Sequence, residues 1–368
     1  MKVFFDHRIF FYQKYGGISR YYVYLFEYLK NKLSPKTKIK SFIYINNYLK
    51  QTSSSDFKGI YLNTFNWNST TKVLAVKLLN YIYEFFSLVF FAPDIYHITY
   101  YDRIPFHFRK TKIVVSVYDM IHELYPNEYD SKASIIKKEC ISKADLVICI
   151  SGNTKTDLIR LFGTDEKKIK VIYLGFANFD KVLNEMSTPE ILTKPFILFV
   201  GQRFGYKNFT GLVNAYASSF QLQSDFNLVC CGGGSLTEKE MALLIELHVE
   251  NKVFQISGDD DMLKLCYQKA SVFVYPSLYE GFGIPPLEAM SVNTPVCCSN
   301  SSSIPEVVGN AAILFDPSDI SQIKNAMIKV LYSEEEKNKL VLAGKERLSL
   351  FTWENCAQQT FDAYKSIL

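Results

Sequence analysis

Two glutamates, Glu280 and Glu288, flank a short stretch with the residues of an anion-binding site. Between them stand Gly283 and a Pro-Pro pair, which fits the first turn of a helix because proline has no N–H to leave unbonded there. The N–H groups of Gly283 and Ile284 then lie at a helix N-terminus, where free donors and the helix dipole attract phosphate. Two solvated surface acids are the alternative, but the Gly-Phe-Gly and Pro-Pro context favours a site for a phosphorylated ligand.

A second stretch supplies the positive charge that such a ligand needs. Arg203 and Lys207 stand four residues apart on a glycine-containing loop that directly follows the apolar run at 196–200. Two such cations can hold a diphosphate and neutralise the charge of a departing nucleotide, although many Arg–Lys pairs are only surface residues. The next apolar run ends in three glycines at 232–234, which indicate either a nucleotide passing close to the backbone or simply a tight turn.

The first half of the chain has candidates of its own. Gly16 and Gly17 stand between the first expected strand and the first expected helix, where a ligand can approach the backbone. His97, Asp119 and His122 lie at the ends of the apolar runs at 94–98 and 112–117, and open α/β sheets bind ligands at such strand ends. A hydrogen-bonded structural histidine is the alternative for both His residues.

These residues need strands and helices that alternate along the chain. The expected strands are 2–6, 42–45, 58–62, 94–98, 112–117, 145–150 and 169–174, then 196–200, 226–231, 253–257 and 271–275. The expected helices follow Gly17 as far as about residue 32, run over 153–162 between a Ser151 cap and Gly163, and begin again near residues 259 and 285. Residues 47–56 read as a loop, and 176–194 read as a linker. Two doubly wound α/β domains that face a cleft follow from this pattern.

Composition agrees with a soluble globular protein of two domains. The 368 residues can bury two cores, and the eight cysteines show no metal-ligand spacing, which predicts reduced, buried thiols in a cytosolic protein. No export signal is expected, because residues 1–14 show neither a continuous apolar region nor a small-residue cleavage site. The most apolar stretch, 73–93, contains Lys77 and Glu84 and is therefore expected to be a buried helix rather than a membrane span.

Charge is distributed unevenly along the chain. Residues 1–180 carry a net charge of +10 and the remainder carries −6, which predicts an anionic partner for the first half or a solvated basic face without a partner. No nucleic-acid-binding motif accompanies the charge.

Two clusters of aromatic and basic residues predict salt-sensitive attachment to a cytoplasmic leaflet, with Phe4, Tyr24 and Tyr28 expected in the core. The clusters are Phe10, Phe11, Tyr12, Lys14, Tyr15, Arg20, Tyr21 and Tyr22, and Arg103, Arg109, Lys110 and Lys112.

The stretch SLYEGFGIPPLEA at 277–289 resembles the donor-site signature of the family 4 retaining glycosyltransferases. Other landmarks of this family follow in the expected order from Tyr15 to Pro317, among them the ADLVICIS run at 144–151. The resemblance implies the GT-B architecture: an acceptor-binding domain over 1–175, a nucleotide-sugar domain over 195–350 and a final helix over 351–368 that returns to the first domain. Many relatives carry His-Asp where this chain has Tyr118 and Asp119, and a phenol can still donate a hydrogen bond to a sugar hydroxyl.

The resemblance also implies a function. A hexose, with mannose as the leading expectation, would pass with retention from a GDP- or UDP-sugar to a glycan, lipid-linked in surface polysaccharide (lipopolysaccharide, O-antigen or capsule) synthesis. The enzyme would need no metal and no cofactor, and it would work in the cytoplasm or on the inner face of the cytoplasmic membrane. A non-hydrolysing sugar-nucleotide epimerase and a catalytically silent sugar-nucleotide binder remain the alternatives.

The resemblance assigns roles to single residues. The catalytic set is Glu280, Arg203, Lys207 and Asp119. The donor-binding set is Gly16, Gly17, Arg203, Lys207, Gly232, Gly233, Ser257, Gly258, Glu280, Gly281, Phe282, Gly283, Ile284, Pro285 and Glu288, with Glu288 expected at the ribose hydroxyls. The acceptor-binding set is His97, Tyr100, Tyr118 and His122.

Overall fold

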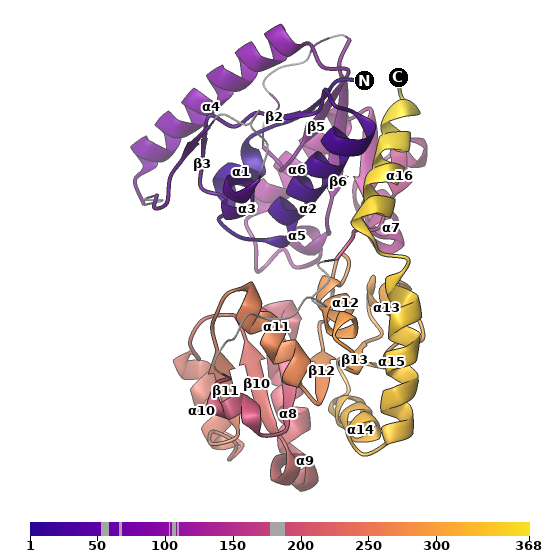
Figure 1. The fold of residues 1–368 in the computed structure, drawn as a ribbon. Coiled ribbons are helices and arrows are strands. Elements are labelled where there is room, and N and C mark those ends of the chain that lie inside the picture. Colours follow the sequence, from indigo (N-terminus) through magenta and orange to yellow (C-terminus); the bar gives the residue numbers. More distant parts are fainter. Residues whose placement is uncertain (53–58, 66–67, 103, 105–107, 109, 177–187) are drawn as a thin grey trace. The chain divides into compact units, whose positions relative to one another are not determined.

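The chain folds into two compact units, each built on its own parallel sheet (Figure 1). The computed structural model describes residues 1–52, 59–65, 68–102, 104, 108, 110–176 and 188–368. Unit 1 contains Met1–Gly175 together with Thr352–Leu368, and unit 2 contains Phe176–Phe351. Most of the expected linker at 176–194 lies outside the described residues, and its described part includes a short 3-10 helix at Glu190–Thr193.

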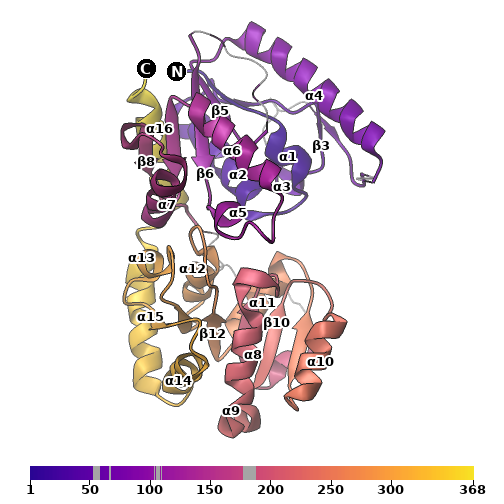
Figure 2. The ribbon, with the colours of Figure 1, turned by 180° about the vertical axis from the view of Figure 1, so that it is seen from behind.

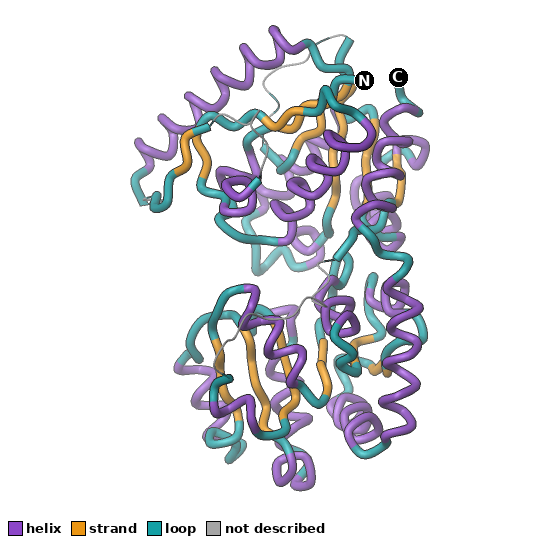
Figure 3. The backbone as a smooth tube through the Cα atoms, in the orientation of Figure 1, coloured by secondary structure: helices purple, strands orange, loops and turns teal. Residues whose placement is uncertain are grey.

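Unit 1 contains a six-stranded parallel sheet in the order β2-β1-β5-β6-β7-β8, beside a separate pair, β3 and β4 (Figure 3). The strands are β1 Val3–Phe5, β2 Lys38–Ile39, β3 Ile43–Tyr44, β4 Ile60–Tyr61, β5 Ile95–Ile98, β6 Lys112–Val117, β7 Leu146–Cys149 and β8 Ile169–Val171. Almost every residue of the central strands β1, β5, β6 and β7 is buried, as expected for a parallel sheet covered by helices on both faces.

Helices cover both faces of the unit 1 sheet (Figure 2). They are α1 Arg8–Tyr12, α2 Gly17–Tyr28, α3 Asn47–Gln51, α4 Thr70–Phe91, α5 Ile121–Leu124, α6 Ser131–Lys143, α7 Gly152–Phe162 and α16 Trp353–Lys365, with a π-helix at Leu29–Leu33 and a 3-10 helix at Glu166–Lys168. One face packs Tyr96 and Val115 against Leu88, Ile141 and Leu158 of α4, α6 and α7. The other face carries α2 and the last helix, α16, which pack together.

Several local predictions for unit 1 are confirmed. The Ser151 side chain accepts a hydrogen bond from the Thr154 N–H at the start of α7, and Gly163 closes that helix in the left-handed region at φ 65°. The three cysteines of unit 1, like the five of unit 2, are buried free thiols. Another prediction is wrong, because residues 47–51 form a short helix that Asn46 caps, rather than a loop. A short helix over residues 8–12 was not expected. The strand at 38–39 was not expected.

The prediction that 73–93 is a buried helix is wrong. Helix α4 forms there, but most of its apolar side chains are exposed, with Phe90 at 84% and Leu78 at 61%. By length and composition alone, this helix could cross a membrane. The sequence pattern failed because the inward side of the helix is polar: Asn80 and Glu84 are buried.

The aromatic cluster that was expected at a membrane is instead mostly core. Phe10, Phe11, Tyr21 and Tyr22 are almost completely buried. Tyr24, expected in the core, is 39% exposed and stacks on Trp353 with 4.9 Å between ring centroids. Arg103 and Arg109 of the second cluster lie outside the described residues.

Unit 2 contains a six-stranded parallel sheet in the order β11-β10-β9-β12-β13-β14. Its strands are β9 Phe196–Val200, β10 Asn227–Cys231, β11 Val253–Ile256, β12 Val272–Tyr275, β13 Val296–Ser299 and β14 Ile313–Phe315. Its helices are α8 Phe209–Ala217, α9 Phe220–Asp225, α10 Glu238–Glu246, α11 Asp260–Lys269, α12 Ile284–Ser291, α13 Ile304–Val308, α14 Ile320–Leu331 and α15 Glu334–Leu348, with a 3-10 turn at Gly205–Lys207.

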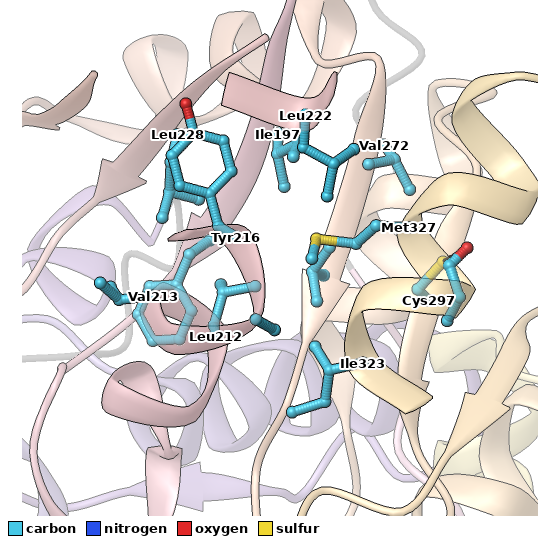
Figure 4. Packing of buried hydrophobic residues seen from close by; sticks show 14 of the residues in the cluster. Ile197, Leu212, Val213, Tyr216, Leu222, Leu228, Val272, Cys297, Ile323 and Met327 are labelled. Atoms are coloured by element: carbon cyan, nitrogen blue, oxygen red, sulfur yellow. Dashed lines mark hydrogen bonds between the residues drawn. The ribbon is translucent and has the colours of Figure 1, made fainter. Parts of the chain in front are cut away.

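Alternation along the strands builds the core of unit 2 (Figure 4). Ile197 on β9, Leu228 on β10 and Val272 on β12 point to the same side, because side chains of a strand alternate between its two faces. There they meet Tyr216 of α8 and Met327 of α14. This packing fixes the carboxyl ends of β9 and β12 next to each other.

A buried ion cluster lies in unit 1 where the strands β1 and β5 end. Arg8 is completely buried between the carboxylates of Asp6 and Glu84, and it donates a 2.9 Å hydrogen bond to the Tyr96 hydroxyl. Burial raises the pKa of Asp6, although Arg8 opposes this shift. Burial would also raise the pKa of Glu84, but Arg8 and His7 outweigh it and lower the pKa to about 2. Glu84 is therefore charged in the folded protein at any ordinary pH.

We expect Glu84→Gln to lower the free energy of unfolding of unit 1 by about 3 kcal/mol at pH 7, because it leaves Arg8 without one of its buried partners. The folded pKa of Glu84 lies below the unfolded value of about 4.3, so this contribution is present above pH ~4.3 and fades as pH falls toward 2. Urea unfolding followed by tryptophan fluorescence measures it, since Trp353 on α16 belongs to unit 1.

The matched control is Glu139→Gln. Glu139 pairs with Lys143 at 2.6 Å on the surface, with 45% and 42% of the two side chains exposed. Its loss is expected to change the unfolding free energy by less than about 0.5 kcal/mol. Equal effects of the two substitutions, or an effect of Glu84→Gln that grows as the pH falls below 4, would contradict the proposed role of the cluster.

Candidate functional site

The order of strands in unit 2 creates a switch point between β9 and β12. From β9 the chain continues outward to β10 and β11, and it then returns to the other side of β9 with β12. In open α/β sheets, ligands bind outside the carboxyl ends of strands at such a point. Lys207 follows β9 and Glu280 follows β12, so two predicted site residues come from the two strands that border it.

Lys207 and Glu280 form an ion pair at this switch point. The Lys207 Nζ atom lies 2.6 Å from Oε1 of Glu280, and only 17% and 10% of the two side chains are exposed. The rings of Tyr206 and Tyr275 lie 5.1 and 5.5 Å from the Lys207 ammonium, an arrangement that favours a cation. Burial and the nearby Glu280 carboxylate raise the pKa of Tyr275, which keeps this phenol neutral.

Polar residues that the sequence analysis missed hold the two loops together. Asn208 has a left-handed backbone with φ 54°, and its side chain donates hydrogen bonds to the carbonyls of Pro276 and Pro317 at 3.1 and 2.7 Å. The Ser302 hydroxyl accepts from the Glu280 N–H, and the Ser303 hydroxyl lies 2.8 Å from the carbonyl oxygens of Glu280 and Phe282. The Ser-rich run at 301–303 is the signal that could have identified the last two.

The predicted helix start beside Gly283 is confirmed. Helix α12 begins at Ile284, with the two prolines in its first turn, and Gly283 has φ 117°, a conformation that suits glycine. Gly281 is buried, and the ring of Phe282 packs edge-on against Phe351 at 5.7 Å. Phe282 therefore supports the loop from inside unit 2.

Glu288 lies in the interior of the unit, with 5% of its surface exposed. It stands on the inward side of α12 and accepts a hydrogen bond from the Tyr267 hydroxyl at 3.3 Å. Burial and the Glu288 carboxylate raise the pKa of Tyr267, so its hydroxyl remains a donor. A carboxylate in this position has a fixed orientation, which a role at ribose hydroxyls requires.

Arg203 is buried and is therefore not a surface cation. Only 2% of its side chain is exposed, and it pairs with Glu240 at 2.8 Å. Its guanidinium donates to the carbonyls of Gly232, Gly234 and Ser235 at 2.8, 3.0 and 2.9 Å. In this structure Arg203 is thus the residue that holds the glycine loop after β10.

Two observations explain why the loop after β10 consists of three glycines: the backbone conformation and the contact with Arg203. Gly232, Gly233 and Gly234 have φ of 91°, 73° and 73°, a region that side chains disfavour. A Cβ on Gly233 would also lie 2.8 Å from Nη1 of Arg203 and 2.9 Å from the carbonyl oxygen of Gly201. The tight-turn alternative therefore accounts for the loop without a ligand.

In the loop after β11, the hydroxyl of Ser257 is bonded to Gln255, and Gly258 packs tightly against Met262.

His97 belongs to the core of unit 1. It is completely buried, with Nδ1 2.6 Å from the Tyr364 hydroxyl and Nε2 2.9 Å from the Ser116 hydroxyl. Burial lowers its pKa to about 3, so the ring is neutral. The structure therefore contradicts its predicted contact with an acceptor, and the hydrogen-bonded structural histidine is the correct alternative.

The other candidates in unit 1 gather after β5 and β6. Tyr100 is partly buried, and burial together with the charge of Asp119 raises its pKa. Asp119 accepts the N–H of Ile121, the first residue of α5, at 3.0 Å, while His122 on that helix lies against Tyr129 at 4.6 Å between ring centroids. Tyr118 is 6% exposed and is thus close to the core.

Gly16 and Gly17 lie at the start of α2. Gly16 precedes the helix in extended backbone, and Gly17 is exposed with open space around its Cα, so the backbone is accessible there. The part of the chain that the structure describes contains no group of three or more His, Cys, Asp or Glu side chains suited to a metal ion.

Family models match both halves of the chain. Residues 180–347 match the model described as glycosyl transferases group 1, and residues 59–177 match the model described as glycosyltransferase family 4. Together with the switch-point site and the signature at 277–289, these matches identify the chain as a member of the family 4 glycosyltransferases. The two parallel-sheet units have the GT-B fold.

Named relatives share part of their length with this chain. It is 30% identical to the O-antigen chain mannosyltransferase B of Escherichia coli over 62% of each chain. It is 28% identical to the O-antigen chain mannosyltransferase RfbU of Salmonella typhimurium over 58% of this chain and 59% of the relative. The matches thus span about 60% of these relatives.

Solved structures match over almost the whole chain. The sucrose-phosphate synthase of Thermosynechococcus elongatus has a TM-score of 0.75 at 19% identity and covers 99% of this chain and 98% of its own. Anabaena HepE in complex with UDP and glucose has a TM-score of 0.71 at 16% identity and covers all of both chains. At these identities the likeness concerns the fold.

We expect Gly233→Ala to destabilise unit 2 more than Gly234→Ala. Both positions have φ 73°, so both variants lose about 1–2 kcal/mol to the left-handed backbone. Only the Cβ at Gly233 meets Arg203 and Gly201, since nothing lies within 4 Å of a Cβ at Gly234. Differential scanning calorimetry should therefore give a further loss of about 1–3 kcal/mol for Gly233→Ala alone. Equal losses would show that Arg203 does not pack closely on the loop.

Proposed function

We propose that this protein transfers a hexose, with retention of configuration, from a nucleoside diphosphate sugar to a glycan acceptor. We propose mannose as the sugar, because the named E. coli and Salmonella relatives are O-antigen chain mannosyltransferases. The same names support a place in surface polysaccharide synthesis, with a lipid-linked glycan as acceptor on the cytoplasmic side of a membrane. The matches cover about 60% of those relatives, so this function is an inference from the shared part of the chain.

The observation that carries the proposal is the Lys207–Glu280 pair at the switch point of unit 2. Lys207 lies among aromatic rings and next to the loop that follows β12. In this position its charge can neutralise a diphosphate as the bond to the sugar breaks. Glu280 can then orient the sugar and support the positive charge that develops at its anomeric carbon. Arg203, which the resemblance places at the donor diphosphate, is also a positioning residue in this scheme, because its guanidinium is bonded to the carbonyls of the glycine loop.

Retention follows if the acceptor attacks from the face that the diphosphate leaves. The bond between the anomeric carbon and the phosphate oxygen breaks, and a bond to the acceptor oxygen forms on the same face. The acceptor's hydroxyl proton passes to the departing phosphate oxygen, so no enzyme nucleophile is required. On the acceptor side we propose Asp119, Tyr118, Tyr100 and His122 of unit 1, with the hydroxyl of the partly buried Tyr100 as a donor to a sugar oxygen.

A panel of nucleotide sugars tests the function. GDP-mannose, UDP-glucose, UDP-galactose and UDP-N-acetylglucosamine would be compared first by thermal shift and then by transfer to an undecaprenyl-linked glycan. We expect one donor to stabilise the protein and to yield a glycosylated acceptor. An epimerised nucleotide sugar would support the epimerase alternative, and binding without product would support a silent sugar-nucleotide binder.

We expect Lys207→Ala to lower kcat for transfer about 10²- to 10³-fold, because the charge that stabilises the leaving diphosphate is lost. Lys345→Ala, which removes an exposed lysine on α15, is the control and should leave kcat unchanged. Steady-state kinetics with the preferred donor measures both variants. Near-normal turnover of Lys207→Ala would remove this residue from the mechanism.

We expect Glu288→Ala to weaken binding of the nucleoside diphosphate by at least about tenfold, because charge-assisted bonds to the ribose hydroxyls are lost. Tyr267→Phe is the matched control, since it removes the hydroxyl that bonds to Glu288 but keeps the carboxylate. Isothermal titration calorimetry should find nearly normal affinity for this control. The same weakening in both variants would mean that Glu288 acts only through its contact with Tyr267.

A further inference from the structure

Helix α4 has polar residues on its buried side and apolar residues on its exposed side. A helix on the surface of a soluble protein usually has the opposite arrangement. Its buried residues are Asn80, Glu84 and Leu88, spaced four apart along one side. The Asn80 side chain accepts the N–H groups of Phe42 and Ile43 at 3.0 and 2.9 Å and donates to the Ile43 carbonyl at 3.0 Å. Glu84 belongs to the buried ion cluster with Arg8. Polar contacts therefore attach this helix to unit 1.

The outward side of α4 is apolar from Leu74 to Phe90. Both views of the fold show the helix along the margin of unit 1 (Figures 1 and 2). Its exposed large apolar residues are Leu74, Leu78, Leu79, Ile82, Phe85, Phe86, Val89 and Phe90, with exposed fractions from 37% to 84%. At 1.5 Å per residue, the 22-residue helix is about 33 Å long. A continuous apolar stripe of this size indicates an interaction surface.

Charge indicates what this surface contacts. Glu84 is the one acidic residue in the sequence of α4, and it is buried. Around the helix lie ammonium groups: Lys2 and Lys38 lie 5.7 and 4.9 Å from the Phe91 ring, and Lys40 lies 5.8 Å from the Tyr83 ring. Lys72 is exposed in the first turn. An apolar stripe bordered by lysines is complementary to an anionic lipid surface, where apolar residues enter the acyl boundary and lysines meet the headgroups.

We infer that α4 is a membrane-docking helix that lies in the interface of an anionic bilayer, with its Leu, Ile and Phe stripe inserted. The helix lies on the membrane and does not cross it, because crossing would pull Asn80 and Glu84 away from their partners in unit 1. A second copy of the chain is the less suitable occupant, since pairing two α4 helices brings their lysines together. This inference rests on the proposed function and specifies how the enzyme reaches a lipid-linked acceptor.

Vesicle sedimentation tests the inference without donor or acceptor, so it can fail while transfer succeeds. The purified protein is compared with the variant L78Q/F86Q/F90Q, which removes apolar surface and changes no charge. The matched control, I245Q/F220Q/L342Q, changes three exposed apolar residues on unit 2. Vesicles of phosphatidylcholine with about 30% phosphatidylglycerol should retain the protein and the control, and retain the α4 variant at least about tenfold less.

Two further measurements distinguish insertion from attraction by charge and from self-association. Tryptophan placed by F86W should shift its emission to shorter wavelength on these vesicles and be quenched by brominated lipid. Light scattering should show a monomer without vesicles. Equal retention of the α4 variant and the control would overturn the inference, and so would a dimer that L78Q/F86Q/F90Q separates into monomers.

Discussion

The buried contact between Glu84 and Arg8 determines how a long, apolar helix can sit on unit 1. Glu84 lies inside the unit with Arg8, His7 and Tyr96, and a charge in such a place is stable only while its partners are present. Rotating α4 to bury its leucines and phenylalanines would bring Glu84 into contact with water and leave Arg8 unpaired in the interior. The apolar side of the helix therefore faces outward as a consequence of electrostatics.

Unit 2 depends on a different constraint, the proximity of the carboxyl ends of strands β9 and β12. Because β12 pairs with β9, the loops that carry Lys207 and Glu280 come together and the two side chains form an ion pair. Asn208 and Ser303 then fix the backbones of both loops by hydrogen bonds. The result is a charged pair whose geometry is set before any substrate binds, which is the condition for electrostatic stabilisation without costly rearrangement.

Arg203 is a buried cation that holds a loop in place. Its guanidinium is bonded to Glu240 and to three carbonyls of the glycine loop, so the positive φ values of that loop are stabilised from inside. Arginine suits this position because its planar group presents several N–H donors in fixed directions.

The sequence by itself determined the alternation of strands and helices, the start of α12 beside Gly283 and the Ser151 cap, since each depends on neighbouring residues. It also indicated the family through residues 277–289. Tertiary structure decided that His97 is a neutral core residue, that Arg203 holds a loop and that α4 faces outward. Each of these depends on partners distant in sequence: Tyr364 for His97, Gly232 for Arg203 and Arg8 for Glu84. Composition and periodicity describe a residue and its neighbours, whereas burial of a charge is settled only by the groups that folding brings to it.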